Sequence, residues 1–155
     1  MYTLSESGGP ANYSSTDVWV CTGNGSFTSP NKIDLDSGES ATCTITNTDD
    51  PLSLTLEKIV INLDGGTALD TDWTLAFSGP DNGSGVEGNP AVTNVAVDAG
   101  KYVLSESGGP SNYSTTGVWA CTGDGTFASP DTISLGLGDT ATCRITNDDE
   151  ATPDA

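Results

Sequence analysis

The chain repeats itself at an offset of 100 residues. Residues 2–49 align with residues 102–149 without a gap, and 31 of the 48 aligned positions are identical. A period of this length is typical of a whole β-sandwich domain and exceeds that of a solenoid repeat. Because residues 52–100 have no earlier counterpart, we expect one complete repeat preceded by the C-terminal half of another.

The repeat predicts the domain boundaries. The polar stretch 48–51 and the Pro-containing tail have the composition of linkers. The chain starts within a repeat and has no basic-then-apolar signal segment, so Met1 is interpreted as an artificial start or a cut inside a longer chain. The predicted segments are a half-repeat over 1–49, a linker over 50–51, a complete repeat over 52–149, and a linker or tail over 150–155.

The secondary structure is predicted to be all β. Short β-branched and aromatic runs alternate with Gly, Pro, Asn and Asp clusters, and no helical period is present. Turns are predicted at 24–25, 64–66 and 82–83. Seven strands in about a hundred residues favour an immunoglobulin-like β-sandwich. The expected strands are 52–62, 72–78, 91–97, 101–106, 117–121, 131–135 and 140–147.

The composition excludes several function classes. Four Lys and Arg residues against 22 Asp and Glu residues give a net charge of −18, which argues against nucleic acid or an anionic membrane as a partner. The absence of histidine excludes Ser-His-Asp triads, Cys-His dyads and zinc sites with imidazole ligands. No apolar run approaches the roughly 18 residues of a membrane span. We therefore predict a protein that is neither an enzyme nor inserted in a membrane.

The four cysteines form two pairs with the same separation of 22 residues. A four-thiolate metal site would need close CxxC pairs, which the sequence lacks. Two intradomain disulfides, Cys21–Cys43 and Cys121–Cys143, are therefore predicted, each contributing roughly 3 kcal/mol on the chain-entropy model. Disulfides indicate an oxidising, extracellular compartment.

Acidic and Asn residues gather in three loops, at 34–39, 47–50 and 62–72. None fits an EF-hand, so solvated acidic loops are favoured, with calcium binding as the alternative; no metal or cofactor is predicted. Asp70 and Asp72 stand two residues apart, which does not indicate a glycosidase carboxylate pair.

Strand alternation brings three polar side chains to the inward face of the complete repeat. Every second residue along a strand faces the same way, and three apolar rows each include or end on a polar residue. An isolated buried charge costs several kcal/mol, so these groups are expected to meet one another. They are Lys58 in strand 52–62, Glu106 in strand 101–106 and Asn147 in strand 140–147.

An amine, an acid and a carboxamide in a dry site can form an amide bond. Burial lowers the pKa of a lysine and raises the pKa of a carboxylic acid. The neutral Lys58 amine can attack the side-chain carbonyl carbon of Asn147, while Glu106 protonates the oxygen and then the leaving ammonia. This single-turnover reaction needs proximity and exclusion of water. The alternative is that Lys58 reaches the rim and pairs with Glu106, while Asn147 caps a strand end.

These residues resemble the Cna protein B-type domains, also called prealbumin-like or SpaA-like repeats, of bacterial surface adhesins and pilins. The family signature YxLxETxAPxGY is similar to the segment 102–113, although Ser107, Gly109 and Asn112 depart from it. The resemblance covers residues 52–149, and residues 2–49 in the partial copy. The matching positions are Tyr102, Leu104, Glu106, Pro110 and Tyr113.

The resemblance implies a prealbumin-like sandwich in which a first-strand Lys is linked to a last-strand Asn. Those roles fall on Lys58 and Asn147, with Glu106 as the catalyst. Cysteines are not part of the general family pattern, so a disulfide could supplement the amide or replace it. In the partial copy Glu6 and Asn47 match, but the partner lysine is absent from the chain. This half is expected to be disordered, to be completed by upstream residues, or to accept strands from another copy and so build a fibre.

The predicted function is a stalk or spacer in a secreted, cell-surface bacterial adhesin or filament, cross-linked against pulling and proteolysis. One alternative is a polymerising subunit whose residues 2–49 are completed by residues 52–100 of a neighbour. Another is a module that binds sugars or a surface through loops at 79–90. The expected partners are neighbouring repeats, other copies of the chain, or a host or environmental surface.

Overall fold

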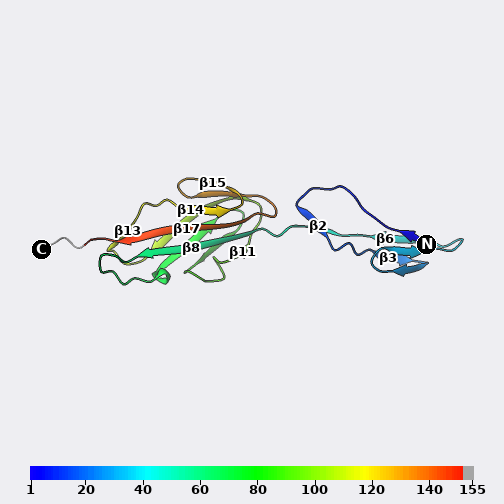
Figure 1. Cartoon of the computed structure of the whole chain (residues 1–155), viewed down its shortest axis with the longest axis horizontal. Helices are drawn as coiled ribbons and strands as arrows, with labels where there is room; N and C mark the ends of the chain where they lie inside the picture. The colour runs from blue at the N-terminus through cyan, green and yellow to red at the C-terminus, as the bar shows by residue number, and fades with distance from the viewer. Residues whose placement is uncertain (152–155) are drawn as a thin grey trace. The chain divides into compact units, whose positions relative to one another are not determined.

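The computed structural model describes residues 1–151 and divides into two compact units between Asp50 and Pro51. We call residues 1–50 the first unit and the residues from Pro51 onward the second unit. Figure 1 shows strands as the main regular elements of each unit. The units are described separately below.

The second unit is a β-sandwich of two sheets. One sheet has the strand order β10-β9-β12-β16-β15, and the other has the order β11-β8-β17-β13, with β14 also paired to β17. A single 3-10 turn, η1 (Asp70–Asp72), precedes β9. Within residues 51–151 the strands are β8 (Ser53–Ile61), β9 (Trp73–Ser78), β10 (Asn82–Gly85), β11 (Val95–Ala96), β12 (Gly100–Gly108), β13 (Tyr113–Thr115), β14 (Ala120–Gly123), β15 (Thr126–Ala128), β16 (Thr132–Leu135) and β17 (Thr140–Asp149).

The first and last strands of this unit are parallel neighbours. The nine residues of β8 pair in register with Thr140–Asp148 of β17, and Figure 1 shows the two strands side by side. This register places Lys58 opposite Ile145 and Asn147 opposite Val60. Because side chains alternate along each strand, Lys58 and Asn147 lie on the same face of the sheet, two positions apart.

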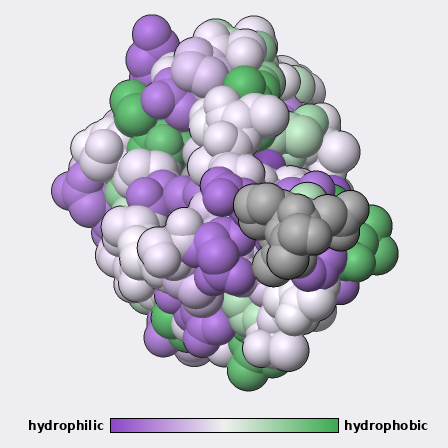
Figure 2. All heavy atoms as spheres, turned by 90° about the vertical axis from the view of Figure 1, so that its left-hand side faces the viewer, coloured by the Kyte–Doolittle hydropathy of each residue, from purple (hydrophilic) through white to green (hydrophobic). Residues whose placement is uncertain are grey.

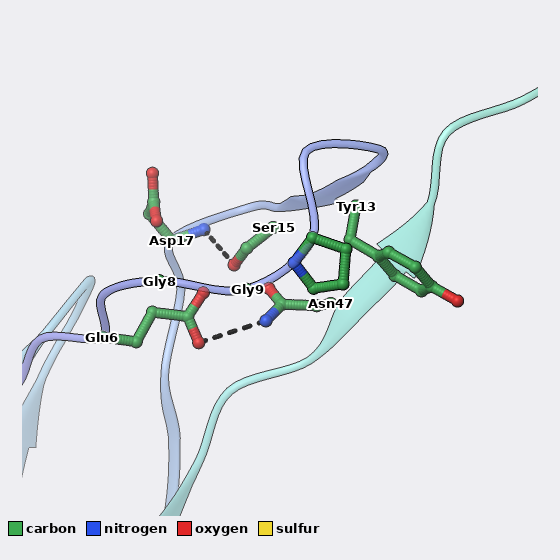
Figure 3. A pocket seen from close by; sticks show the side chains of 8 residues that line it. Glu6, Gly8, Gly9, Tyr13, Ser15, Asp17 and Asn47 are labelled. Carbon is green, nitrogen blue, oxygen red and sulfur yellow. Dashed lines mark hydrogen bonds between the residues drawn. The ribbon is translucent and has the colours of Figure 1, made fainter. Parts of the chain in front are cut away.

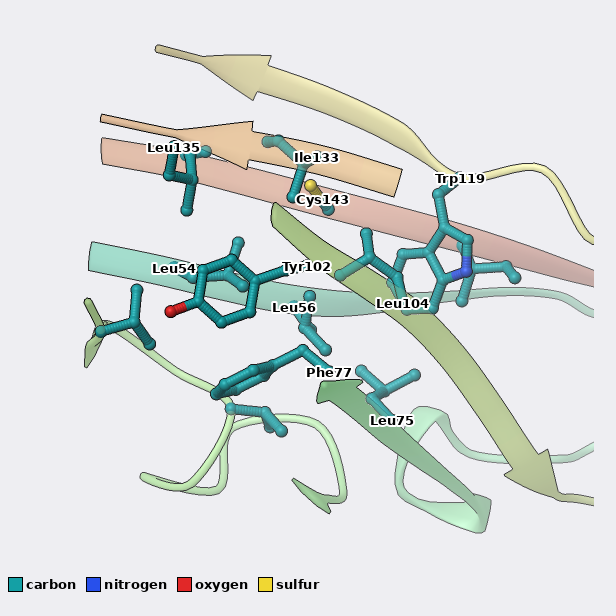
Figure 4. Close-up of a cluster of buried hydrophobic side chains, with 14 of the residues drawn as sticks. Leu54, Leu56, Leu75, Phe77, Tyr102, Leu104, Trp119, Ile133, Leu135 and Cys143 are labelled. Atoms are coloured by element: carbon teal, nitrogen blue, oxygen red, sulfur yellow. The ribbon is translucent and has the colours of Figure 1, made fainter. Parts of the chain in front are cut away.

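Apolar side chains from both sheets interdigitate to form the core, as Figure 4 shows. Leu54 and Leu56 of β8 are fully buried, as the predicted alternation requires. Across the core, the Phe77 and Tyr102 rings pack edge to face with centroids 5.8 Å apart. The Tyr102 hydroxyl donates a hydrogen bond to the Asp98 carbonyl, so the aromatic ring is buried without leaving its polar end unpaired.

The structure differs from the sequence prediction in the number and bounds of its strands. Ten strands replace the expected seven, because short partners such as β13 and β15 are set by pairing with longer strands. The predicted turn at Asn82–Gly83 is wrong: both residues lie in β10. Gly83 is required there, because a Cβ would lie 2.4 Å from the Phe77 ring.

The segment predicted as a strand over 91–97 is mostly irregular, and only β11 remains. Beyond β11, backbone amides on this edge of β8 instead donate single hydrogen bonds to residues of the loop. The Leu56 amide donates to the Val92 carbonyl, and the Lys58 amide donates to the Glu87 carboxylate. Pro90 and the positive φ of 50° at Asn94 are incompatible with a continuous ladder.

The first unit pairs its own strands and is not an irregular coil. Each register repeats that of the second unit with numbers lower by 100; for example, Tyr2 lies opposite Ile33, as Tyr102 lies opposite Ile133. Its sheets have the orders β1-β5-β4, β2-β7 and β3-β6. Its strands are β1 (Tyr2–Thr3), β2 (Tyr13–Ser15), β3 (Val20–Gly23), β4 (Ser26–Thr28), β5 (Lys32–Asp34), β6 (Ala41–Thr44) and β7 (Asn47–Asp49).

The surface in Figure 2 mixes hydrophilic and neutral side chains with small, separated hydrophobic ones. Scattered apolar side chains of this kind are ordinary on a solvent-facing domain. Within residues 1–151, no helix has the length and apolar character needed to cross a bilayer.

Candidate cross-linking site

Lys58 lies in the interior of the second unit, although it carries an amine. Its side chain is 0% exposed, and its Nζ lies 2.8 Å from Oε2 of Glu106, whose side chain is 11% exposed. Lys58 belongs to β8, whereas Glu106 reaches across from β12 in the facing sheet. The predicted meeting of these two side chains is therefore present in the structure, and both lie inside the sandwich rather than at its rim.

Asn147 lies beside this pair on β17. It is buried, and the β8–β17 register sets it diagonally across from Lys58 on the same face. Diagonal neighbours in a sheet have backbones about 7–8 Å apart, a distance that the four-carbon stem of a lysine can span. Two adjacent strands and one strand of the facing sheet thus contribute one residue each.

Three polar atoms at this place lack hydrogen-bond partners of good geometry. They are Lys58 Nζ, Glu106 Oε2 and Asn147 Oδ1, and each is buried. The amine and the carboxylate nevertheless lie 2.8 Å apart, which is close enough for an ion pair. Buried polar atoms without partners are rare in folded proteins, so three at one site require a chemical explanation.

Burial lowers the pKa of the Lys58 amine, and the nearby Glu106 carboxylate offsets part of that effect. A lowered pKa increases the fraction of neutral amine, which is the nucleophilic form. The environment of Lys58 therefore favours the neutral amine, which is the form that the predicted reaction with Asn147 needs.

Two aromatic rings form one wall of the site. Lys58 Nζ lies 4.8 Å from the centroid of the Trp73 ring, and Trp73 packs edge to face against Tyr113 at 5.4 Å. Trp73 falls within the predicted strand 72–78, but alternation along a strand does not show which side chain a residue contacts. A neutral or charged amine is accommodated well on an aromatic face, so Trp73 excludes water without displacing Lys58.

Glu87 is a residue that the sequence reasoning missed. It accepts a hydrogen bond from the Lys58 backbone amide and so fixes the strand at the lysine itself. Burial raises the pKa of Glu87, while this hydrogen bond acts in the opposite sense. Glu87 lies in an irregular Gly- and Pro-containing loop, where no periodicity exists to indicate its direction.

Asp149 was also missed, although the alternation that gave Asn147 extends to it. It is buried and accepts hydrogen bonds from the amides of Leu63, Asp64 and Gly66, which pins the loop after β8. Desolvation raises its pKa, but the backbone donors together bring the net pKa below the usual value. A Cβ at Gly66 would lie 2.1 Å from the Tyr113 hydroxyl and 2.8 Å from Asp149 Oδ2, so a larger residue there would displace these side chains.

Both predicted disulfides are present, Cys21–Cys43 and Cys121–Cys143. Each joins directly opposed residues of adjacent antiparallel strands, β3 with β6 and β14 with β17. The bridges therefore lie within a sheet, unlike the inter-sheet bridge of antibody domains. The second bridge ties β14 to β17, the strand that also carries Asn147, whereas Asn47 lies in β7, after the bridged strand β6.

The first unit holds the matching acid and carboxamide without a lysine. Asn47 Nδ2 donates a hydrogen bond of 3.2 Å to Glu6 Oε2, and both side chains are exposed. Figure 3 shows this pair at the edge of an open hollow of about 340 Å³. The other residues around the hollow include Gly8, Gly9, Pro10 and Tyr13.

The acidic loops do not form a recognisable metal centre. Among residues 1–151, no group of three or more Cys, Asp or Glu side chains lies together as potential metal ligands. Within the loop at 34–39, the Glu39 carboxylate accepts a hydrogen bond from the Asp36 amide. The structure therefore assigns no residue of these loops to a cation.

Comparison with known proteins identifies the family. The prealbumin-like fold domain of the SpaA type matches residues 1–45 and 49–145, which is most of the chain. No curated protein and no solved structure matches the chain. Domains of this family are structural rather than catalytic and serve as extracellular components of pili. The two-sheet sandwich and the profile match agree, and the chain belongs to the SpaA-type family of prealbumin-like fold domains.

Proposed function

We propose that the chain is a load-bearing stalk segment of an extracellular bacterial adhesin or filament, and that an amide between Lys58 Nζ and Asn147 Cγ locks its second unit. The observation that supports this proposal best is the buried Lys58 amine, held 2.8 Å from Glu106 and next to the strand that carries Asn147. The ion pair gives Lys58 Nζ and Glu106 Oε2 a partner but leaves the buried Asn147 Oδ1 without one.

The proposed bond forms by loss of ammonia. The neutral Lys58 amine attacks Asn147 Cγ, and the Glu106 carboxylic acid donates a proton to the amide oxygen. As the tetrahedral intermediate collapses, the bond from Cγ to Nδ2 breaks, and Glu106 relays a proton from the former lysine nitrogen to the leaving ammonia. Trp73 and the core leucines exclude the water that would otherwise compete.

The strand arrangement suits this bond to carry force. Tension on the two ends of the unit pulls β8 and β17 in opposite directions, because these parallel neighbours are the first and last strands. The nine-residue ladder between them is then loaded in shear, with many hydrogen bonds sharing the force. A bond from Lys58 to Asn147 would pass the load directly from β8 to β17 and leave the residues between them unstretched.

Single-molecule pulling tests the proposal. Under reducing conditions, the Lys58→Met variant should release the segment between positions 58 and 147, which are 89 residues apart in sequence, an extension of roughly 300 Å. The wild-type unit should show no step of this size. Lys101→Met, which removes an exposed lysine, is the matched control and should behave as wild type. A 300 Å step in the wild-type protein would show that the bond is absent.

A further inference from the structure

The first unit exposes surfaces that the second unit buries. Tyr2 is 61% exposed, whereas its counterpart Tyr102 is 0% exposed. The residues beside Tyr2 line a groove whose apolar members all have counterparts in the core of the second unit. The apolar members of this groove are Tyr2, Leu4, Ile33, Leu35, Ala41 and Cys43.

The second unit shows what covers this surface. Residues 51–100 supply β8, which pairs with one edge of β17, and β9, which pairs with one edge of β12. In the first unit, β6 and β7 correspond to β17, and β1 corresponds to β12. Within the described part of the chain, those strands pair only with β3, β2 and β5, so no strand takes the place of β8 or β9.

We propose that the first unit is an acceptor for a lysine-bearing segment with the chemistry of residues 51–100, supplied from outside the 155 residues. The segment would add strands to the open edges and bring alternating leucines over the groove, a form of β-strand addition. In the β8–β17 register, its lysine would lie opposite Ile45, facing Glu6 and Asn47. This inference rests on the proposed function, because it assigns the same chemistry to the matching residues.

The charge at the acceptor fits this occupant. Glu6 forms no salt bridge among the described residues, and its one hydrogen bond is to Asn47. Its counterpart Glu106 faces the Lys58 amine at 2.8 Å. A lysine delivered to the hollow beside Glu6 would therefore find the acid and the carboxamide that Lys58 has in the second unit.

A second copy of the chain is the less favourable donor. Its residues 51–100 already cover residues 101–149, and the Lys58 side chain is enclosed. Exchanging that segment would uncover one acceptor surface for each one that it covers, so the total buried area would not increase. A donor outside these residues adds buried area without such a loss.

The proposed covalent step in the first unit is the same loss of ammonia that we propose for the second unit. The donor lysine nitrogen bonds to Asn47 Cγ, the bond from Cγ to Nδ2 breaks, and ammonia leaves after Glu6 relays a proton to it. No oxidant or further reactant is needed. The joined chains therefore weigh about 17 Da less than their sum.

The test mixes the full 155-residue chain with a synthetic polypeptide of residues 51–100 and measures intact mass after reduction and denaturation. We expect an adduct lighter than the sum by one ammonia. It should be lost with Asn47→Ala in the chain or Lys58→Ala in the polypeptide, and kept with the matched control Asn24→Ala. Native mass spectrometry of the same mixture measures binding without the bond.

Every other result of this experiment contradicts a specific component of the proposal. A non-covalent complex without an adduct overturns the covalent step, and no complex overturns the acceptor surface. Covalent oligomers of the chain alone show that a second copy is the donor. The mass of the chain without added polypeptide tests the second unit separately. If that mass lacks the ammonia deficit expected for the Lys58–Asn147 bond, the proposed function fails as well as this inference.

Discussion

Replacing Glu106 by Gln should prevent the Lys58–Asn147 bond while changing the core little. Gln has nearly the same volume as Glu but cannot donate and recover a proton as the carboxylic acid does. The bond would close a loop of 89 residues, from 58 to 147, or about 67 residues by the shorter path through Cys121–Cys143. The chain-entropy model gives roughly 4 kcal/mol for a cross-link of that span.

For a domain of about 100 residues, a loss of 4 kcal/mol lowers the melting temperature by roughly 15–30 °C. We expect calorimetry to show this shift in the transition of the second unit, and mass spectrometry to show that about 17 Da of ammonia mass is regained. Glu57→Gln is the matched control: Glu57 pairs with Arg144 at the surface, so the melting temperature should change by a few degrees only. The reasoning is refuted if Glu106→Gln keeps the ammonia deficit, or if it melts no lower than the control.

Three further predictions concern the surroundings of the site. Glu87→Ala should destabilise the second unit by about 1–3 kcal/mol in chemical unfolding, because the Lys58 amide loses its acceptor; Glu87→Gln keeps an acceptor oxygen and should cost less, and equal effects would contradict this role. Asp149→Asn should destabilise the unit at neutral pH. The folded pKa of Asp149 is lowered, so its stabilising effect is present above about pH 4, the unfolded value, and is lost as the pH falls through the folded pKa. The difference between Asp149→Asn and wild type should therefore shrink in acid, and a difference that stays constant down to pH 2 would count against it. Replacing Cys121 and Cys143 together by Ala should cost about 3 kcal/mol without restoring the ammonia mass, since the disulfide and the proposed amide would be separate cross-links; a regained ammonia would mean that the disulfide is needed for the bond.

Alternation allowed the inward row of each long strand to be predicted from sequence. Lys58 and Asn147 were placed with the core residues because direction along a strand repeats every two residues, whatever the partner strand is. The same rule would have found Asp149, which continues the row of Asn147. It could not find Glu87, because a loop with Pro90 and Gly88 has no fixed period.

The strand partners were beyond the sequence reasoning. Nothing in residues 53–61 states that β8 lies parallel to β17 with Lys58 opposite Ile145, because that register depends on the packing of the whole sandwich. Short strands such as β10 and β15 were missed for a related reason. The β10 sequence Asn-Gly-Ser-Gly has weak strand propensity, and the three residues of β15 are too few to show an alternation, so both become strands through their neighbours.

The measurement that tests the central claim most directly is the intact mass of the wild-type chain after its disulfides are reduced, followed by fragment mapping. We predict a mass about 17 Da below that of the sequence, and one branched peptide that joins Lys58 to Asn147. A full-length chain at its unmodified mass, with Lys58 and Asn147 in separate linear peptides, would contradict the account and leave the disulfide as the cross-link of the second unit.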